Sequence, residues 1–99
     1  MTNEKIHREL NENGSGKLSV KENGEELGLM EIEISETAVT ARHTEVFPAA
    51  EGKGLGKKLF MALVELAREK KLQIMPLCPF VHAQLRRMKE EVKDVWQGD

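Results

Sequence analysis

The segment E-G-K-G-L-G-K-K-L, residues 51–59, is the most informative part of this chain. It places three glycines at alternate positions directly before leucines with helical spacing. Glycine lets the backbone approach a ligand without a Cβ in the way. The loop amides and the unpaired N–H groups of the first helical turn form an anion site, to which Lys57 and Lys58 add positive charge. We therefore interpret residues 51–59 as a loop that binds a pyrophosphate.

Two other glycine motifs do not match this segment. The dinucleotide pattern G-x-G-x-x-G, counted from Gly52, puts Lys57 at its last glycine, and counting from the next glycine also fails. The nucleoside-triphosphate pattern G-x-x-x-x-G-K-[ST] puts Glu51 at its first glycine and Lys58 at its hydroxyl position. A tight turn that only caps a helix is the remaining alternative, although such a turn needs one or two glycines rather than three.

Upstream of the loop, apolar and polar residues alternate in short segments, which is typical of strands. Asn-Gly pairs at residues 13–14 and 23–24 indicate tight hairpin turns. The alternation changes phase near Met30 and Glu31, which predicts a β-bulge, and Pro48 ends the last segment because it has no N–H for a ladder. We therefore expect an antiparallel meander with strands at residues 6–10, 17–22, 27–34 and 38–47.

Downstream of the loop, the spacing of the apolar residues becomes helical. Leu55, Leu59 and Leu63 lie on one stripe, so we expect a helix over residues 54–70. Residues 73–77 form a short apolar strand. Because a crossover between strands of one sheet is right-handed and joins parallel strands, this strand should run parallel to the one before the loop.

The last third of the chain predicts a second helix. Val81, Leu85, Met88 and Val92 recur at spacings of four, three and four, and Val95 and Trp96 are expected to pack onto the body of the protein. The predicted fold class is α+β: an antiparallel meander, then a helix, a parallel strand and a C-terminal helix. A chain of 99 residues suits a single domain, residues 1–99.

Composition limits the function further. The 15 Lys and Arg against 17 Asp and Glu give a net charge of −2, so neither nucleic acid nor an anionic membrane is an expected partner. The longest apolar stretch, residues 59–66, contains Glu65 and is too short to span a bilayer. The single cysteine excludes an internal disulfide, and the histidines at 7, 43 and 82 indicate no metal site. We expect a cytoplasmic protein.

The passage V-F-P-A-A-E-G-K-G-L-G-K-K-L, residues 46–59, resembles the GNAT superfamily of N-acetyltransferases. The pattern of that family is Arg or Gln, two residues, Gly, one residue, then Gly or Ala. Here those positions fall on Glu51, Gly54 and Gly56, so Glu51 departs from the family pattern. The order of the predicted elements agrees along most of the chain, whereas the motif itself covers only residues 44–59.

The resemblance implies the ligand and its position. In that family acetyl-CoA lies between two splayed parallel strands, with its diphosphate on the loop amides and its pantetheine along the strand before the loop. It implies acetyl transfer to a primary amine of a small molecule or peptide, by direct attack. The cofactor-binding residues that the resemblance implies here are Val46, Phe47, Gly52, Lys53, Gly54, Leu55, Gly56 and Lys57.

The chain also departs from typical members of the family. Two helices usually follow the first strand, whereas here only residues 11–16 occupy that place, as in the short subgroup with an open acceptor side. Many members use a late Tyr as general acid, and this sequence has no Tyr. These departures leave two alternatives: a non-enzymatic acyl-CoA-binding sensor or adaptor, and a small interaction domain without a cofactor. The acceptor and the oligomeric state stay open.

Three residues are candidates for the chemistry. Cys78 precedes Pro79 at the start of the second helix, with His82 four residues on. It is a transient acyl acceptor, or the acid that protonates the departing thiol, or a small buried hydrophobe. His43 and Glu45 share one face of the strand before the loop. They supply a general base or attract a cationic acceptor, or they belong to an exposed polar face.

Overall fold

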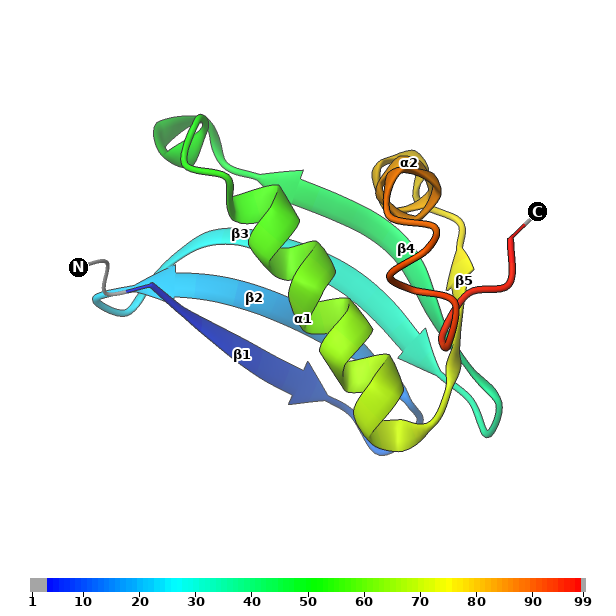
Figure 1. Ribbon diagram of the computed structural model, residues 1–99. Coiled ribbons are helices and arrows are strands. Elements are labelled where there is room, and N and C mark those ends of the chain that lie inside the picture. Colours follow the sequence, from blue (N-terminus) through cyan, green and yellow to red (C-terminus); the bar gives the residue numbers. More distant parts are fainter. Residues whose placement is uncertain (1–3, 99) are drawn as a thin grey trace.

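The first four strands form an antiparallel meander, and the fifth lies parallel beside the fourth, in the order β1-β2-β3-β4-β5. The computed structural model describes residues 4–98. Figure 1 shows the helix α1 lying across the sheet. The elements are β1 (Glu4–Leu10), β2 (Ser15–Glu22), β3 (Glu25–Ile34), β4 (Ala38–Val46), the 3-10 helix η1 (Pro48–Ala50), α1 (Leu55–Lys70), β5 (Gln73–Pro76) and α2 (Pro79–Arg87).

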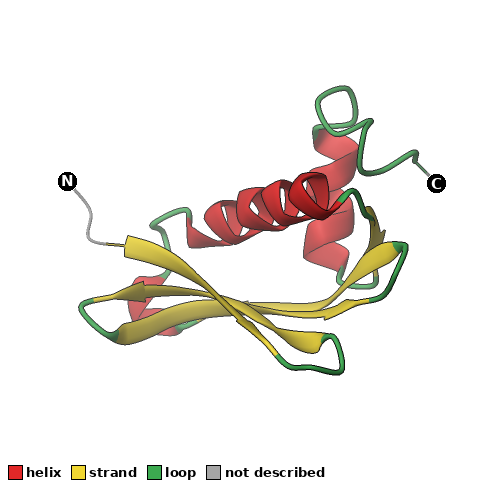
Figure 2. Cartoon of the chain, turned by 90° about the horizontal axis from the view of Figure 1, so that it is seen from below, coloured by secondary structure: helices red, strands yellow, loops and turns green. Residues whose placement is uncertain are grey.

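These elements confirm the predicted α+β fold class. α1 lies along one face of the sheet and α2 stands at its β5 end, so that neither helix covers the opposite face (Figure 2). We call that opposite side the open face. None of the helices in the described part of the chain is long and apolar enough to cross a membrane.

The core lies between α1 and the sheet. Leu59, Phe60 and Leu63 of α1 are completely buried, and they pack against the inward-facing residues of the strands. Completely burying a side chain of this size contributes roughly 1.5–3 kcal/mol. The helix therefore lies firmly on the sheet, which fixes where its N-terminus meets the end of β4.

The predicted bulge is present between β3 and β4. Glu31 pairs with His43, whereas its neighbour Ile32 pairs with Ala41, so that Arg42 is the extra residue on β4. An extra residue reverses the side-chain alternation of the strand that contains it. Beyond the bulge, Thr44 pairs with the buried Met30 and therefore points to the helix side, while His43 points to the open face.

The second helix is shorter than predicted. It ends at Arg87 rather than continuing to Val92, and turns follow it. Val92, Val95 and Trp96 are still buried, at 1%, 2% and 7% exposure, so the apolar spacing correctly predicted burial but not a continuous helix. The carbonyl of Val95 accepts a hydrogen bond from the N–H of Ile74 at 2.7 Å, which places this last segment along β5. The end of β4 also differs, because the strand stops at Val46 and the unpredicted η1 follows.

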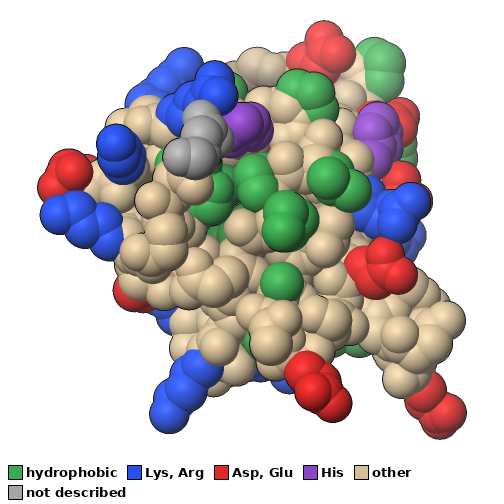
Figure 3. Space-filling view, turned by 90° about the vertical axis from the view of Figure 1, so that its right-hand side faces the viewer, with side chains coloured by type: hydrophobic (Ala, Val, Ile, Leu, Met, Phe, Trp, Pro, Cys, Tyr) green, Lys and Arg blue, Asp and Glu red, His purple; other side chains and the backbone are tan. Residues whose placement is uncertain are grey.

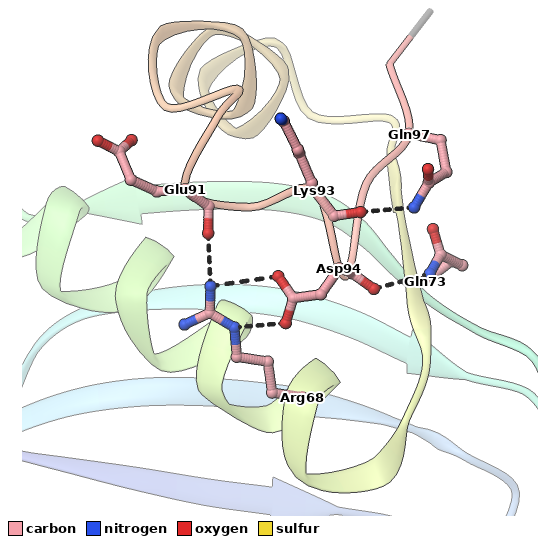
Figure 4. A network of polar contacts seen from close by, with 6 residues as sticks. All are labelled: Arg68, Gln73, Glu91, Lys93, Asp94 and Gln97. Carbon is pink, nitrogen blue, oxygen red and sulfur yellow. Dashed lines mark hydrogen bonds and ion pairs between the residues drawn. The ribbon is translucent and has the colours of Figure 1, made fainter.

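Arg68 fastens the last segment to α1 (Figure 4). Its guanidinium donates to the Asp94 carboxylate at 2.8 and 3.3 Å and to the carbonyl of Glu91 at 2.6 Å. The Gln73 amide donates to the carbonyl of Asp94 at 3.1 Å. These contacts lie beyond the end of α2 at Arg87 and hold the turns that follow it against α1 and β5.

Replacing Arg68 with Gln should lower the melting temperature by a few degrees and change its dependence on pH. The hydrogen bond from Arg68 lowers the pKa of Asp94 below its usual value. A carboxyl whose folded-state pKa is depressed stabilises the fold above its unfolded pKa, and this contribution is lost as pH falls through the folded value. Melting curves between pH 7 and pH 3 should therefore converge for wild type and variant at acid pH. A constant difference at every pH would contradict the assignment.

Candidate functional site

β4 and β5 separate in the middle of the sheet. They pair in parallel from Ala38 with Gln73 to Ala41 with Pro76. The carbonyl of Ala41 then accepts the N–H groups of both Leu77 and Cys78, at 3.0 and 2.9 Å, and the chain turns into α2. β4 continues alone, so the two strands diverge into a wedge beyond this point (Figure 1).

The β4 side of this wedge carries unpaired peptide groups. The N–H of Phe47 donates to Leu27 of β3 at 2.9 Å, and the carbonyl of Glu45 lies so close to Gly28 that a Cβ there would stand 2.9 Å from it. Because peptide groups alternate along a strand, those of Thr44 and Val46 point away from β3 into the wedge. An extended ligand can pair with them as a further strand would.

The glycine loop presents its amides at the mouth of the wedge. Gly54, at φ +72°, precedes α1 as its N-cap, and the first hydrogen bond of the helix runs from Lys58 N–H to Gly54 at 3.3 Å. Among residues 4–98, the amides of residues 52–57 donate to no backbone carbonyl. Unpaired amides at a helix N-terminus bind anions because they carry the positive end of the helix dipole. This geometry fits a diphosphate.

The predicted loop residues do not all contribute in the same way. The side chain of Leu55 is buried, at 1% exposure, so only its amide can face a ligand. A Cβ at Gly56 would stand 3.0 Å from the ring of Phe80, so this glycine also makes room for α2 against α1. Both backbone groups of Phe47 are engaged within the protein, which leaves only its side chain for a ligand.

Charges surround the loop amides. Lys53 and Lys57 are exposed, and so is Glu51, which ends η1. Cations at this position favour a bound diphosphate, whereas a carboxylate opposes it. The loop is therefore basic with one unfavourable charge, as the sequence predicts.

Cys78 and Thr44 meet across the wedge on its helix side. The Cys78 thiol donates to the Thr44 hydroxyl at 3.4 Å, and Cys78 is only 4% exposed. Cys78 is also the N-cap residue of α2, without a side-chain cap. The ring of His82, which the sequence places near Cys78, packs edge-on against Trp96 with centroids 5.8 Å apart.

His43 and Glu45 lie together on the open face. Their nearest side-chain atoms, Nε2 and Oε1, are 3.4 Å apart, and the side chains are 55% and 52% exposed. They occupy the opposite side of β4 from Thr44. The structure therefore brings together two of the predicted catalytic residues on the open face and places the third, Cys78, across the strand from them.

The β5 side of the molecule is apolar at its centre. Figure 3 shows hydrophobic side chains gathered there, with charged side chains around them. Met75 and Leu77 are the most exposed large hydrophobic residues, at 52% and 62%. Since Ile74 is buried under the helix side, alternation places Met75 on the open face. An acceptor that approaches the wedge from this face would meet both polar and apolar groups.

Sequence reasoning did not single out Thr44 or the unpaired β4 edge. The sequence placed Thr44 on the face opposite His43, the bulge at Arg42 turns that face to the helix side, and the contact of Thr44 with Cys78 depends on the register between β4 and β5. Within residues 4–98, no three metal-binding side chains gather.

Comparisons with known proteins agree on one family. The family model described as GCN5-related N-acetyl-transferase matches residues 17–95. A Staphylococcus aureus protein described as a GCN5-like N-acetyltransferase is 29% identical over 100% of this chain and 93% of its own, with a TM-score of 0.71. No curated protein sequence matches the chain.

More distant structures share the fold. Ribosomal-protein-alanine N-acetyltransferase from Brucella melitensis biovar Abortus 2308 is 20% identical, with a TM-score of 0.63 over 82% of this chain. This chain spans 62% of that protein's length. Nourseothricin acetyltransferase is 17% identical, with a TM-score of 0.59 over 88% of this chain and 68% of its own. The matched profile, the fold and the loop at the wedge confirm the resemblance found in the sequence: the chain belongs to the GCN5-related N-acetyltransferase family.

Proposed function

We propose that this chain binds acetyl-CoA in the wedge between β4 and β5 and transfers the acetyl group to a primary amine, with residues 1–99 acting as one catalytic domain. The observation that carries the proposal is the run of unpaired amides at residues 52–57, beside an unpaired β4 edge. The amides suit a diphosphate, and the edge suits an extended arm that carries amide groups of its own, such as pantetheine.

Each part of the site then has a role in positioning. The amides of residues 52–57, with Lys53 and Lys57, hold the diphosphate. The peptide groups of Thr44 and Val46 orient the pantetheine along β4. Bound acetyl-CoA supplies a thioester that is already activated for attack by an amine. Holding both reactants at fixed positions removes much of the entropic barrier to their reaction.

Proton transfer requires a base and an acid on the two sides of β4. His43, held by Glu45, removes a proton from the acceptor ammonium, so that the nitrogen lone pair can attack the acetyl carbon. As the carbon–sulfur bond breaks, Cys78 would give its thiol proton to the departing sulfur and regain one from water, while the attacking nitrogen, which becomes an amide, would release its extra proton to water. Thr44 fixes the direction of the thiol before transfer. The acceptor, a small-molecule or peptide amine, enters from the open face.

The test is a calorimetric titration with acetyl-CoA, with NADH and ATP as controls, followed by a screen of amines for release of the CoA thiol. Selective binding of acetyl-CoA with amine-dependent thiol release is the expected result. Failure to bind acetyl-CoA would overturn the proposal. Binding with only slow thioester hydrolysis, whatever amine is offered, would instead favour an acyl-CoA sensor, for which Glu51 and the open acceptor side leave room.

Replacing Glu51 with Gln should tighten acetyl-CoA binding by about 2- to 5-fold. The change removes a carboxylate beside the anion site, and at separations of 6–8 Å in a watery environment one unit charge contributes about half a kcal/mol. Calorimetry at low and at high salt measures the effect, which should shrink as salt screens the charge. Glu36→Gln, at an exposed turn before β4, is the matched control. Weaker binding by the Glu51 variant would show that this carboxylate assists the site.

Replacing Cys78 with Ala should lower kcat by at least about 10-fold while leaving the affinity for acetyl-CoA unchanged, because the variant lacks the proton donor. Cys78→Ser keeps an O–H donor of similar size and should retain more activity than Cys78→Ala. Single-turnover transfer and calorimetry separate the two effects. Unchanged transfer by Cys78→Ala would show that Cys78 is a small buried hydrophobe and not an acid.

A further inference from the structure

β1 forms an unpaired edge of the sheet. Among residues 4–98 it pairs only with β2, and the hydrogen bond from Asn11 N–H to the carbonyl of Ser15, at 2.7 Å, fixes which residues face β2. By alternation, His7 and Glu9 turn their peptide groups to β2, and the contact of the Glu9 carbonyl with the Gly16 position agrees. The peptide groups of Ile6 and Arg8 therefore point outward. Such an edge is a template for another strand.

A groove of about 1010 Å³ runs beside this edge, between β1 and the exposed flank of α1. Ile6 and Met61 line it and are 38% and 39% exposed, which is unusual for large apolar side chains in this molecule. One end of the groove is formed by Lys53, Gly54 and Lys57 of the glycine loop, whereas Ile6 and Met61 lie along its β1 side and have no assigned role in the proposed acetyl transfer. Two apolar side chains beside an unpaired strand favour a protein segment as the occupant.

We propose that the occupant is a second copy of this chain, with β1 paired antiparallel to its own copy across a two-fold axis at His7. Only Ile6 and Arg8 in the middle of the strand offer outward peptide groups, so they must form the hydrogen-bonded pairs. With the axis at His7, Ile6 of each copy lies opposite Arg8 of the other. The sheet then continues through both copies, and the two grooves merge over the interface.

Charge favours this register over an axis at Arg8, which would put like charges opposite each other, and over an axis at Ile6, which would need an Arg8 that already bonds to Glu69 at 2.6 Å. With the axis at His7, Lys5 lies opposite the Glu9 of the other copy, and the reverse pair forms at the same time. A shift of the axis to Ile6 or Arg8 separates these partners. Directly opposed unlike charges stabilise a strand pair by roughly 0.2–1 kcal/mol relative to alanines. In a two-fold interface each such pair occurs twice, so the contribution doubles.

The charges on the exposed flank of α1 are also complementary between two copies related by the two-fold axis. Its first half carries Lys57 and its second half carries Glu65 and Glu69. Figure 1 shows β1 and α1 running in the same direction, and Arg8 near the end of β1 bonds to Glu69 near the end of α1 at 2.6 Å. Because the two-fold reverses the direction of the second copy, the basic half of one α1 lies level with the acidic half of the other. Met61 of each copy then covers the apolar centre.

Sedimentation equilibrium of the wild-type protein tests the interface without any ligand. The expected mass at high micromolar concentration is twice the 11.2 kDa of one chain. Met61→Glu should sediment as a monomer, whereas the matched control Met75→Glu, also an exposed methionine but on β5, should remain a dimer. A monomeric wild type would overturn the proposal, and so would a dimer that survives Met61→Glu. These results do not depend on whether the chain transfers acetyl groups.

Cross-linking tests the register. In a Cys78→Ala background, His7→Cys places the new cysteines opposite each other across the axis, where Cβ atoms are about 4.5–5.5 Å apart, close enough for a disulfide after a small shift. Lys5→Cys places them opposite Glu9 instead. The expected result is a covalent dimer with His7→Cys under mild oxidation and little with Lys5→Cys. Faster cross-linking at residue 5 than at residue 7 would exclude the proposed register.

Discussion

Replacing Gly54 with Asp should weaken acetyl-CoA binding by about 100-fold or more while leaving the protein folded. Gly54 is the N-cap of α1 at φ +72°, a conformation that Asp tolerates better than most residues. An N-cap Asp accepts hydrogen bonds from the first amides of the helix. It would thus occupy the donors that hold the diphosphate and place a like charge within a few ångströms of it, which costs several kcal/mol at a partly screened site. Calorimetric titration measures the loss.

Gly24→Asp is the matched control. Gly24 lies in the turn between β2 and β3 at φ +83°, and a Cβ there meets nothing within 4 Å, as at Gly54. The backbone strain of the two substitutions is therefore similar, but only one lies at the site. Melting curves should show both variants folded, and only Gly54→Asp should lose binding. Wild-type affinity in Gly54→Asp would contradict the assignment of the loop, as would an equal loss in Gly24→Asp.

Replacing His43 with Ala should lower kcat/KM by about 100-fold, the usual contribution of a positioned general base. In the wild type, kcat/KM should rise with pH as the base loses its proton. In the variant this limb should be replaced by a rise at higher pH, where the acceptor amine loses its own proton, because only the free amine can then react. A pH–rate profile measured with one amine acceptor makes the comparison. If the limb persists in His43→Ala, another group supplies the base.

The contribution of Glu45 is separable from that of His43. Glu45→Gln keeps the shape of the side chain and removes the carboxylate that faces Nε2 at 3.4 Å, so kcat/KM should fall, because the ring is less well positioned, while the acetyl-CoA affinity stays constant. The control is Glu33→Gln, which removes a carboxylate that pairs with Arg42 at 2.9 Å on the same face. An equal loss of kcat/KM in both variants would reduce the effect to the general charge of the open face.

The sequence predicted what local patterns control. Alternation placed the strands within a few residues, the phase change near Met30 located the bulge, and the glycines located the start of α1. The prediction was wrong where a tertiary contact overrides the pattern. Apolar spacing from Val81 to Val92 cannot distinguish a long helix from a short one followed by a buried turn. The turns that replace the rest of the predicted helix are held by contacts with other elements, such as that of Arg68 with Glu91.

The same distinction between local patterns and tertiary contacts applies to the candidate site. Three glycines in alternate positions located the loop whose amides donate to no backbone carbonyl among residues 4–98, because such a loop depends on backbone geometry within a few residues. The position of Cys78 opposite Thr44 depends instead on the parallel register of β4 with β5, which no local pattern encodes. The groove beside β1 was also not predicted, since it forms between segments more than 40 residues apart in the sequence.

The two outer edges of the sheet, β1 and β5, differ in whether a further strand can pair with them. On β5, the N–H of Ile74 is already bonded to Val95, and Pro76 has no N–H to offer, so a further strand finds little to bind. Of the two outer edges of the sheet, as described over residues 4–98, β1 is the one that can take a further strand, and a two-fold contact uses that edge completely. Self-association of this chain should therefore close at two copies rather than continue into a fibril, which protects a small protein with an exposed strand from aggregation.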